Sequence, residues 1–113
     1  MDSTSHSTAE AGDHIFHALA DRHRRDLLGI LKSGDRSVSG LSEQFSISQP
    51  AISQHLKVLR DAGLVRSRKE GRQAIYSLDA SGFRELSSWL AHYERFWSES
   101  LDRLQDHLKR KVN

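Results

Sequence analysis

The last third of the chain carries the pattern that most limits how it can fold. From Ala80 onward, apolar residues recur at alternating steps of three and four, which is the spacing of one face of an α-helix. The stripe comprises Phe83, Leu86, Leu90, Tyr93, Trp97, Leu101, Leu104 and Leu108, widened by Trp89 and Phe96. This pattern predicts one long helix with more apolar surface than a chain of 113 residues can bury on its own.

Such a surface favours a homodimer, because large apolar side chains left in water forfeit their burial energy. We expect Phe83 and Leu86 to pack on the chain's own domain and the rest of the stripe to face a second copy. The residues expected at this interface, two of them from the first helix, are Ile15, Phe16, Leu90, Tyr93, Trp97, Leu101 and Leu104.

The length of the chain suits a single domain. We divide it into a flexible N-terminal tail (residues 1–12), a core (13–79) and the dimerisation helix (80–113), which belongs to the same domain. The tail is polar and rich in Ser and Thr, unlike a signal peptide, and no apolar run could span a bilayer. We therefore expect a cytoplasmic protein without a membrane partner. The absence of cysteine excludes disulfides and thiolate metal sites.

Positive charge is concentrated in one segment of the chain. The formal net charge of only +2 barely favours a nucleic-acid partner by itself. Between residues 48 and 72, however, the only acidic residues are Asp61 and Glu70. They are outnumbered by Lys57, Arg60, Arg66, Arg68, Lys69 and Arg72.

Three helices are predicted in the first part of the chain. Apolar spacing indicates the first over residues 14–20. Asp21 is suited to cap a second helix, which ends before Gly34. Apolar residues then recur from Val38 to Phe45 and predict a third helix of about two turns, given 3.6 residues per turn.

A fourth helix and a hairpin complete the predicted core. Ser48 can cap the fourth helix, which Gly63 ends, and two β-tolerant runs (64–69 and 73–78) flank a turn at residues 70–72. The predicted fold is mainly α with a small β-hairpin, in the order α-α-α-α-β-β-α. The short break between the third and fourth helices is typical of a helix-turn-helix, and the hairpin makes it a winged one.

The fourth helix carries a continuous polar face. In a helix-turn-helix the second helix of the motif enters the major groove, where Gln49, Ser53 and Gln54 would offer donors and acceptors to base edges. Lys57 would lie nearer the phosphates, and Ser48 with the free amides of the first turn would form an anion site. A polar helix face is often merely solvated, but the preceding short helix and the basic hairpin favour double-stranded DNA as the partner.

The hairpin is basic at and beside its tip. Arg66, Arg68, Lys69 and Arg72 lie there, and strand alternation puts Arg66 and Arg68 on one face. These side chains could reach the adjacent minor groove or the DNA backbone. The alternative interpretation is solubilising charge that prevents an edge strand from pairing with another chain.

Residues 48–65 read Ser-Gln-Pro-Ala-Ile-Ser-Gln-His-Leu-Lys-Val-Leu-Arg-Asp-Ala-Gly-Leu-Val, followed by Glu70-Gly71-Arg72 and Ile75-Tyr76-Ser77-Leu78. These residues closely resemble the recognition helix and wing of ArsR/SmtB-family repressors, and the similarity spans about residues 15–78. The resemblance implies a dimeric winged-helix repressor that binds an imperfect palindrome, often in its own promoter. One departure is Arg22-His23, where many members carry Pro-Thr before the paired arginines.

His55 belongs to a Ser-Xaa-His-Leu pattern that is common in such helices. Its position on the helical wheel faces the body of the domain. A partly buried, hydrogen-bonded histidine and a DNA contact both remain open interpretations.

The resemblance also implies two places for metal ligands, and neither is complete. The thiolate site of the third helix would fall on residues 40–44, which contain no cysteine. When the chain is aligned with the family pattern on Tyr76-Ser77-Leu78, the four ligand positions of the second site hold residues that do not bind metal. Shifting the alignment by one residue puts ligand-type residues at only two of the four positions. The positions are Ala80, Gly82, Tyr93 and Phe96 in the first register and Asp79, Ser81, His92 and Arg95 in the second. We therefore predict no metal site and no cofactor.

Three further histidines are candidates for a weaker site. His14 and His17 are three residues apart on the first helix, and His107 lies far along the last one. A bare histidine pair has low specificity for metal, so we expect these residues to have surface or packing roles. A histidine site that bridges two subunits stays an alternative.

The sequence shows no nucleophile elbow, phosphate-binding glycine loop or paired carboxylates, so we do not expect an enzyme. We interpret the chain as a sequence-specific DNA-binding transcriptional regulator, a repressor that acts as a homodimer and whose effector is not indicated. The alternatives are a histidine-based metal-responsive repressor and a winged-helix protein-interaction module that has lost DNA binding. The intact polar face of the fourth helix argues against the second of these.

Overall fold

The computed structural model describes residues 12–112. The flexible tail predicted for residues 1–12 therefore lies outside the described residues, apart from Gly12. A first helix occupies residues 12–19. The elements that follow are α2 (Arg22–Lys32), β1 (Arg36–Ser37), α3 (Val38–Ser42), α4 (Gln49–Asp61), β2 (Val65–Glu70), β3 (Gln73–Leu78) and α5 (Ala80–Val112).

Helix α2 begins and ends as its sequence predicts. The Asp21 side chain accepts a 3.1 Å hydrogen bond from the Arg24 amide and so satisfies one of the donors left free at a helix start. After Lys32 the chain turns away at Gly34, whose φ of 152° is a conformation that glycine adopts without strain. The buried face of α2 consists of Leu27, Leu28 and Leu31.

Helix α3 is shorter than predicted. It ends at Ser42, and Phe45 lies beyond it in a turn held by hydrogen bonds of the i to i+3 type. Phe45 still packs against the core. The apolar spacing therefore predicted its burial correctly but the length of the helix incorrectly. The two-turn helix expected from Val38 to Phe45 is therefore corrected to five residues.

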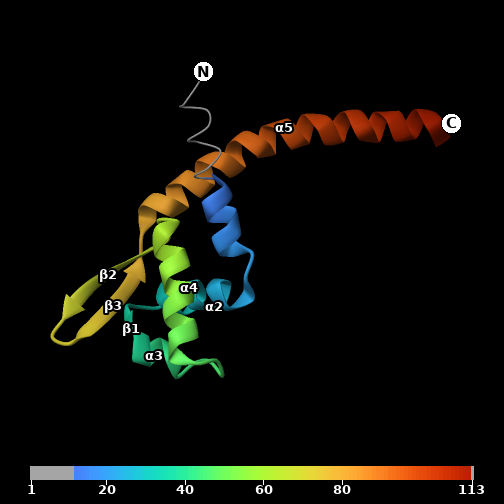
Figure 1. Ribbon diagram of the computed structural model, residues 1–113. Coiled ribbons are helices and arrows are strands. Elements are labelled where there is room, and N and C mark those ends of the chain that lie inside the picture. Colours follow the sequence, from blue (N-terminus) through green and yellow to red (C-terminus); the bar gives the residue numbers. More distant parts are fainter. Residues whose placement is uncertain (1–11, 113) are drawn as a thin grey trace, which may run out of the picture.

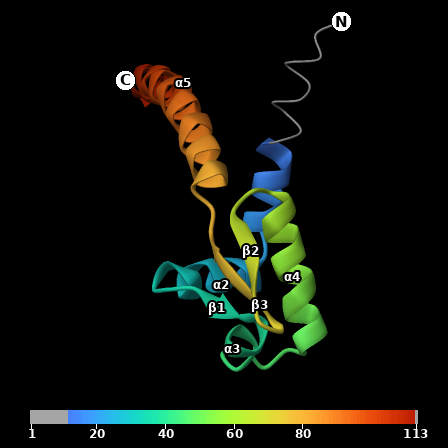
Figure 2. The same cartoon turned by 90° about the vertical axis from the view of Figure 1, so that its left-hand side faces the viewer.

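The core lies where α2, α3 and α4 meet the base of the hairpin. Figure 2 shows these elements close together, and each contributes buried residues to the core. They include Leu27, Leu41, Ile52, Leu56, Leu59, Leu64 and Val65. This packing holds α4 with one face inward and the opposite face free.

The hairpin belongs to a three-stranded antiparallel sheet with the strand order β1-β3-β2. The sequence did not indicate β1, because its two polar residues, Arg36 and Ser37, show no alternation. They pair with Tyr76 and Ile75 in β3. At the tip, Gly71 has a φ of 62°, which is the requirement for the first turn residue of a type II′ hairpin.

Helix α5 starts against the core and then leaves it. Phe83 packs on the core cluster, as predicted, whereas the C-terminal half of the helix extends far beyond the domain (Figure 1). The extents of the molecule, 67 × 38 × 21 Å, reflect this projection. None of the helices in the described part is both long and apolar enough to cross a membrane.

The first helix connects the core to α5. Phe16 meets Trp89 edge to face, with ring centroids 5.8 Å apart, and Trp89 in turn stacks on Tyr93 at 4.7 Å. Ile15 is buried within the chain itself, with 1% of its surface exposed. Its predicted place in the dimer interface is therefore corrected, because it has almost no surface left to offer a partner.

Candidate DNA-binding surface

The polar face of α4 is exposed along the length of the helix. Ile52, Leu56 and Leu59 point into the core, which turns the residues between them outward. The predicted recognition residues Ser48, Gln49, Ser53, Gln54 and Lys57 are all exposed. The structure thus brings the side chains that could read base edges onto one accessible surface.

The start of α4 is capped by its own sequence. The Ser48 hydroxyl accepts a 3.3 Å hydrogen bond from the Ala51 amide, and Pro50 has no N–H to offer. An anion at this end would therefore depend on the Gln49 amide and on the hydroxyl hydrogen of Ser48.

Lys57 is held loosely by a neighbour on the same helix. Its Nζ lies 3.1 Å from Oδ2 of Asp61, one turn away, and both side chains are more than half exposed. Exposed pairs at this spacing contribute only about 0.2–0.5 kcal/mol, so the ammonium can leave Asp61 for a phosphate at little cost.

His55 does not join the exposed face. Its side chain is 19% exposed, and its Nδ1 lies 3.3 Å from Nη1 of Arg24. Arg24 also donates to the carbonyl oxygens of His17 and Ala18 and so connects the first helix, α2 and α4. Of the two interpretations left open by the sequence, the structure supports the partly buried, hydrogen-bonded one.

The wing presents most, but not all, of its basic residues freely. Arg66, Lys69 and Arg72 are exposed. Arg68 is also exposed, yet it donates to Asp35 at 2.8 Å and to Glu70 at 3.1 Å. The Asp35 and Glu70 carboxylates raise the pKa of Arg68 above its ordinary value, and their hydrogen bonds engage Nε and one hydrogen of Nη1 within the chain.

A shallow groove of about 280 Å³ joins the recognition helix to the wing. Gln49 and Ser53 of α4 line one side, and Arg72 and Gln73 of the hairpin line the other. Ser37 and Ser39 also line it, because β1 pairs with β3 and carries the start of α3 to this position. The sequence did not single out Ser37, Ser39 or Gln73, since only the pairing of β1 brings them to this face.

Comparison with known proteins shows to which family this chain belongs. Residues 21–67 match the family model described as bacterial regulatory protein, arsR family. The HTH-type transcriptional regulator Rv2034 of Mycobacterium tuberculosis (strain ATCC 25618 / H37Rv) is 40% identical over 95 residues, which cover 84% of this chain and 86% of that protein. The chain belongs to the ArsR family.

Two further similar proteins agree with this assignment. The transcriptional repressor SdpR of Bacillus subtilis (strain 168) is 32% identical over 72% of this chain and 90% of its own length. The structure of an ArsR-like transcriptional regulator from Rhodococcus sp. RHA1 superposes with a TM-score of 0.75 at 29% identity, covering 88% of this chain and 94% of that one. The ArsR chain described here is thus a DNA-binding transcriptional regulator with a winged helix-turn-helix fold, and it is not an enzyme.

The stripe on α5 of this ArsR chain is the largest apolar feature left uncovered. About half of the surface of most of its large side chains is exposed. The exposed residues are Leu90, Tyr93, Phe96, Trp97, Leu101, Leu104 and Leu108, together with Phe16 of the first helix. Leu86, nearer the domain, is partly buried.

Asp79 has a structural role at the start of α5. Its Oδ1 accepts hydrogen bonds from the amide of Ser81 at 3.0 Å and from its hydroxyl at 2.9 Å. These bonds lower the pKa of Asp79 below its ordinary value. The carboxylate predicted as a possible ligand in the shifted register is thus used to cap the helix.

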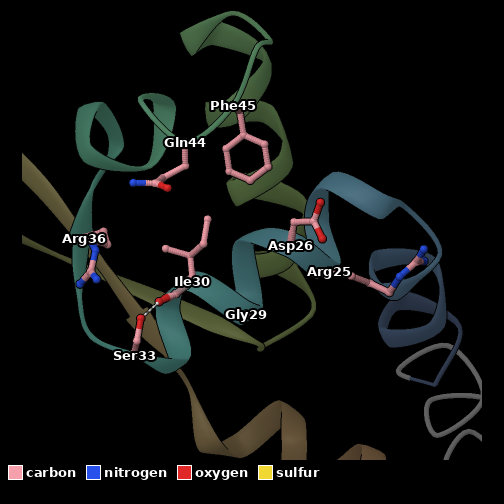
Figure 3. Close-up of a pocket in the computed structure, with 8 residues that line it drawn as sticks. All are labelled: Arg25, Asp26, Gly29, Ile30, Ser33, Arg36, Gln44 and Phe45. Carbon is pink, nitrogen blue, oxygen red and sulfur yellow. Dashed lines mark hydrogen bonds between the residues drawn. The ribbon is translucent and has the colours of Figure 1, made fainter.

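A hollow of about 640 Å³ lies away from the DNA-binding face, between α2 and the turn after α3. Figure 3 shows Ile30 and Phe45 directed into it, while Arg25 and Arg36 point to opposite sides. The Arg25 guanidinium donates to the Leu19 carbonyl and that of Arg36 to the Asp35 carbonyl. The hollow therefore has an apolar floor and no converging charges, and we assign it no ligand.

Proposed function

We propose that this ArsR-family chain represses transcription as a homodimer that binds a palindromic operator. The observation that carries the proposal is the exposed polar face of α4, joined by a groove to the free basic residues of the wing. A major groove admits one helix, and Gln49, Ser53 and Gln54 would face its base edges. Arg72 and Lys69 would contact the flanking backbone or minor groove.

The exposed stripe on α5 supports the dimer. Each large apolar side chain left in water forfeits about 1.5–3 kcal/mol of burial energy. Trp97, Leu101 and Leu104 lie on the part of α5 that extends beyond the domain, so no element of the described chain can cover them (Figure 1). A second α5 related by a twofold axis would bury the stripe and would add Phe16 at its edge.

The twofold axis would also place the two recognition helices. A dimer of helix-turn-helix proteins reads successive turns of the major groove, about 34 Å apart, so its operator is an imperfect palindrome. A dimer bound to such a site within a promoter would block transcription. The relative SdpR is named a transcriptional repressor. The proposed site of action is chromosomal DNA in the cytoplasm, with the chain's own promoter as the first operator to test.

The test measures binding of the untagged chain to a labelled duplex from upstream of its own gene. Fluorescence anisotropy at about 0.15 M salt should show binding at least about 1000-fold tighter than to a scrambled duplex. Sedimentation of the same sample should show a dimer, and one dimer per duplex. Equal binding to both duplexes would contradict the proposed repressor, and no binding to either would favour the protein-interaction module. A monomer that binds the operator tightly would contradict the dimer.

A further inference from the structure

Three ligand-type side chains meet behind the recognition helix, away from the DNA-binding face. Asp21 and His23 come from the start of α2, and His55 comes from the middle of α4. One potential ligand atom from each side chain lies within 4.8 Å of the other two. It is the one such group in the described part of the chain, and it includes neither His14, His17 nor His107.

The two imidazoles converge on one carboxylate oxygen. Nδ1 of His23 lies 3.9 Å from Oδ1 of Asp21, and Nδ1 of His55 lies 4.0 Å from the same atom. The two rings are stacked, with centroids 5.6 Å apart and planes inclined by 27°. Phe45 lies 5.9 Å from the His23 ring and adds an apolar neighbour to the cluster.

The donor atoms of the cluster suit a cation. Arg24 can only donate, so Nδ1 of His55 is the acceptor in their hydrogen bond. Oδ1 of Asp21 accepts from the Arg24 amide and lies 4.0 Å from the same nitrogen. A carboxylate oxygen and an imidazole nitrogen, both of which zinc accepts as ligands, thus lie close together.

We propose that Asp21, His23 and His55 bind a divalent transition-metal ion of the zinc class, with a water molecule in the fourth position. Two imidazoles and one carboxylate form a donor set that such ions accept, and the partial exposure of His23 leaves an entry path. Metal–ligand bonds of about 2.0–2.1 Å require ligand atoms about 3.4 Å apart in a tetrahedron, so the side chains must close by a small rotation.

Metal binding would require Arg24 to give up its hydrogen bond to His55. The metal would replace Nη1 of Arg24 at the His55 lone pair, while Nε and Nη2 would keep their bonds to the carbonyl oxygens of Ala18 and His17. Repulsion between the guanidinium and the metal weakens the site without removing it. His23 stands at one of the two positions where the chain departs from the Pro-Thr pattern, so the departure supplies one of the three ligands.

Binding would add a second connection between α2 and α4, beside the core packing and the contact between Arg24 and His55. A metal held by Asp21, His23 and His55 would clip the start of α2 to the recognition helix. Because an ion that binds only the folded chain stabilises it by mass action, the melting temperature should rise with the metal concentration. The proposal does not depend on DNA binding, and both of its readouts are independent of an operator.

The test uses the full chain without a histidine tag, stripped of metal by EDTA and returned to chelator-free buffer. Competition between the protein and a chromophoric chelator for Zn²⁺ should give one bound ion per protomer, and Co²⁺ should give the visible absorption of a tetrahedral site. Zn²⁺ should also raise the melting temperature. The variant His23→Asn should weaken Zn²⁺ binding at least tenfold and should abolish the thermal shift.

The matched control is His92→Asn, which removes an exposed histidine of α5 that is outside the cluster. It should bind Zn²⁺ as the wild type does. A second variant, His55→Gln, should behave as His23→Asn, and circular dichroism should show that both are folded. The proposal fails if the wild type binds no stoichiometric Zn²⁺ at micromolar concentration, or if His23→Asn and His55→Gln bind it as well as the control.

Discussion

Arg68 in β2 donates a 2.8 Å hydrogen bond to Asp35, in the loop between α2 and β1. Since β3 lies between β1 and β2 in the sheet, this ion pair crosses the central strand and joins the two outer strands. Both arginines are exposed, but Arg68 is held by the Asp35 and Glu70 carboxylates, and no such ion pair is found for Arg72 among the described residues. The two arginines should have different roles.

We predict that Arg72→Ala weakens binding to all duplexes and lowers the slope of log affinity against log salt by about one unit, because the variant neutralises one phosphate fewer. Arg68→Ala should leave that slope unchanged and should lower the melting temperature only slightly, because exposed ion pairs contribute little to stability. Asp35→Ala should reproduce the effect of Arg68→Ala. Anisotropy titrations at several salt concentrations measure the slopes, and a slope reduced by a full unit in Arg68→Ala would show that this arginine contacts phosphate.

Replacing Gln49 and Gln54 together by Ala should reduce discrimination between the operator and random DNA. Each amide that no longer pairs with a base edge should reduce that discrimination by about 1–3 kcal/mol. Both side chains are exposed, so the melting temperature should not change. Gln44→Ala, an exposed glutamine outside α4, is the control and should keep wild-type preference. If the double variant keeps it as well, α4 does not read sequence through these amides.

The sequence predicted the elements whose patterns are local. The caps Asp21 and Ser48 and the stripe of α5 were predicted correctly because each depends on neighbouring residues. The same local reasoning overextended α3, since Phe45 is buried from a turn and not from a helix.

Features that depend on distant pairing were not predictable in this way. Strand β1 is two residues long and exists through its pairing with β3. The place of Ser37 and Ser39 in the groove and the Arg68–Asp35 pair follow from that pairing. The cluster of Asp21, His23 and His55 joins residues more than 30 positions apart in the sequence, so no ligand spacing could indicate it.

Trp97→Glu combined with Leu101→Glu should convert the dimer into a monomer or an aggregate. The two carboxylates would be desolvated in the middle of the proposed interface, and the apolar surface of two half-exposed side chains would be removed from it. Sedimentation should show the change, and tight operator binding should disappear with it. Ser88→Glu combined with Arg95→Gln adds the same two units of negative charge on the opposite face of α5 and should remain dimeric. Dissociation of both variants alike would mean that charge, and not the stripe, controls assembly.

Acid should remove the contribution of the Asp79 cap. The pKa of Asp79 is lowered in the folded chain by the bonds from Ser81, so the charged cap stabilises the fold above its unfolded pKa of about 3.9. That contribution disappears as the pH falls through the folded pKa. Asp79→Asn keeps an acceptor but has no charge, so its denaturation midpoint should lie below that of the wild type at pH 6. The difference between the two midpoints should disappear towards pH 3. A difference that stays constant from pH 6 to pH 3 would show that the charge of Asp79 does not stabilise the helix start.

A backbone hydrogen bond ties the start of α5 to the turn that follows α4. The amide of Gly82 donates a 2.9 Å hydrogen bond to the carbonyl of Gly63, and a Cβ on Gly82 would overlap that carbonyl. In the proposed dimer, the direction in which α5 leaves this contact determines the distance between the two recognition helices. The half-site spacing of that dimer would therefore depend on a close contact between two glycines that lie outside the polar face of α4. New operator sequences can evolve through the exposed face of α4 while the length of the operator stays the same.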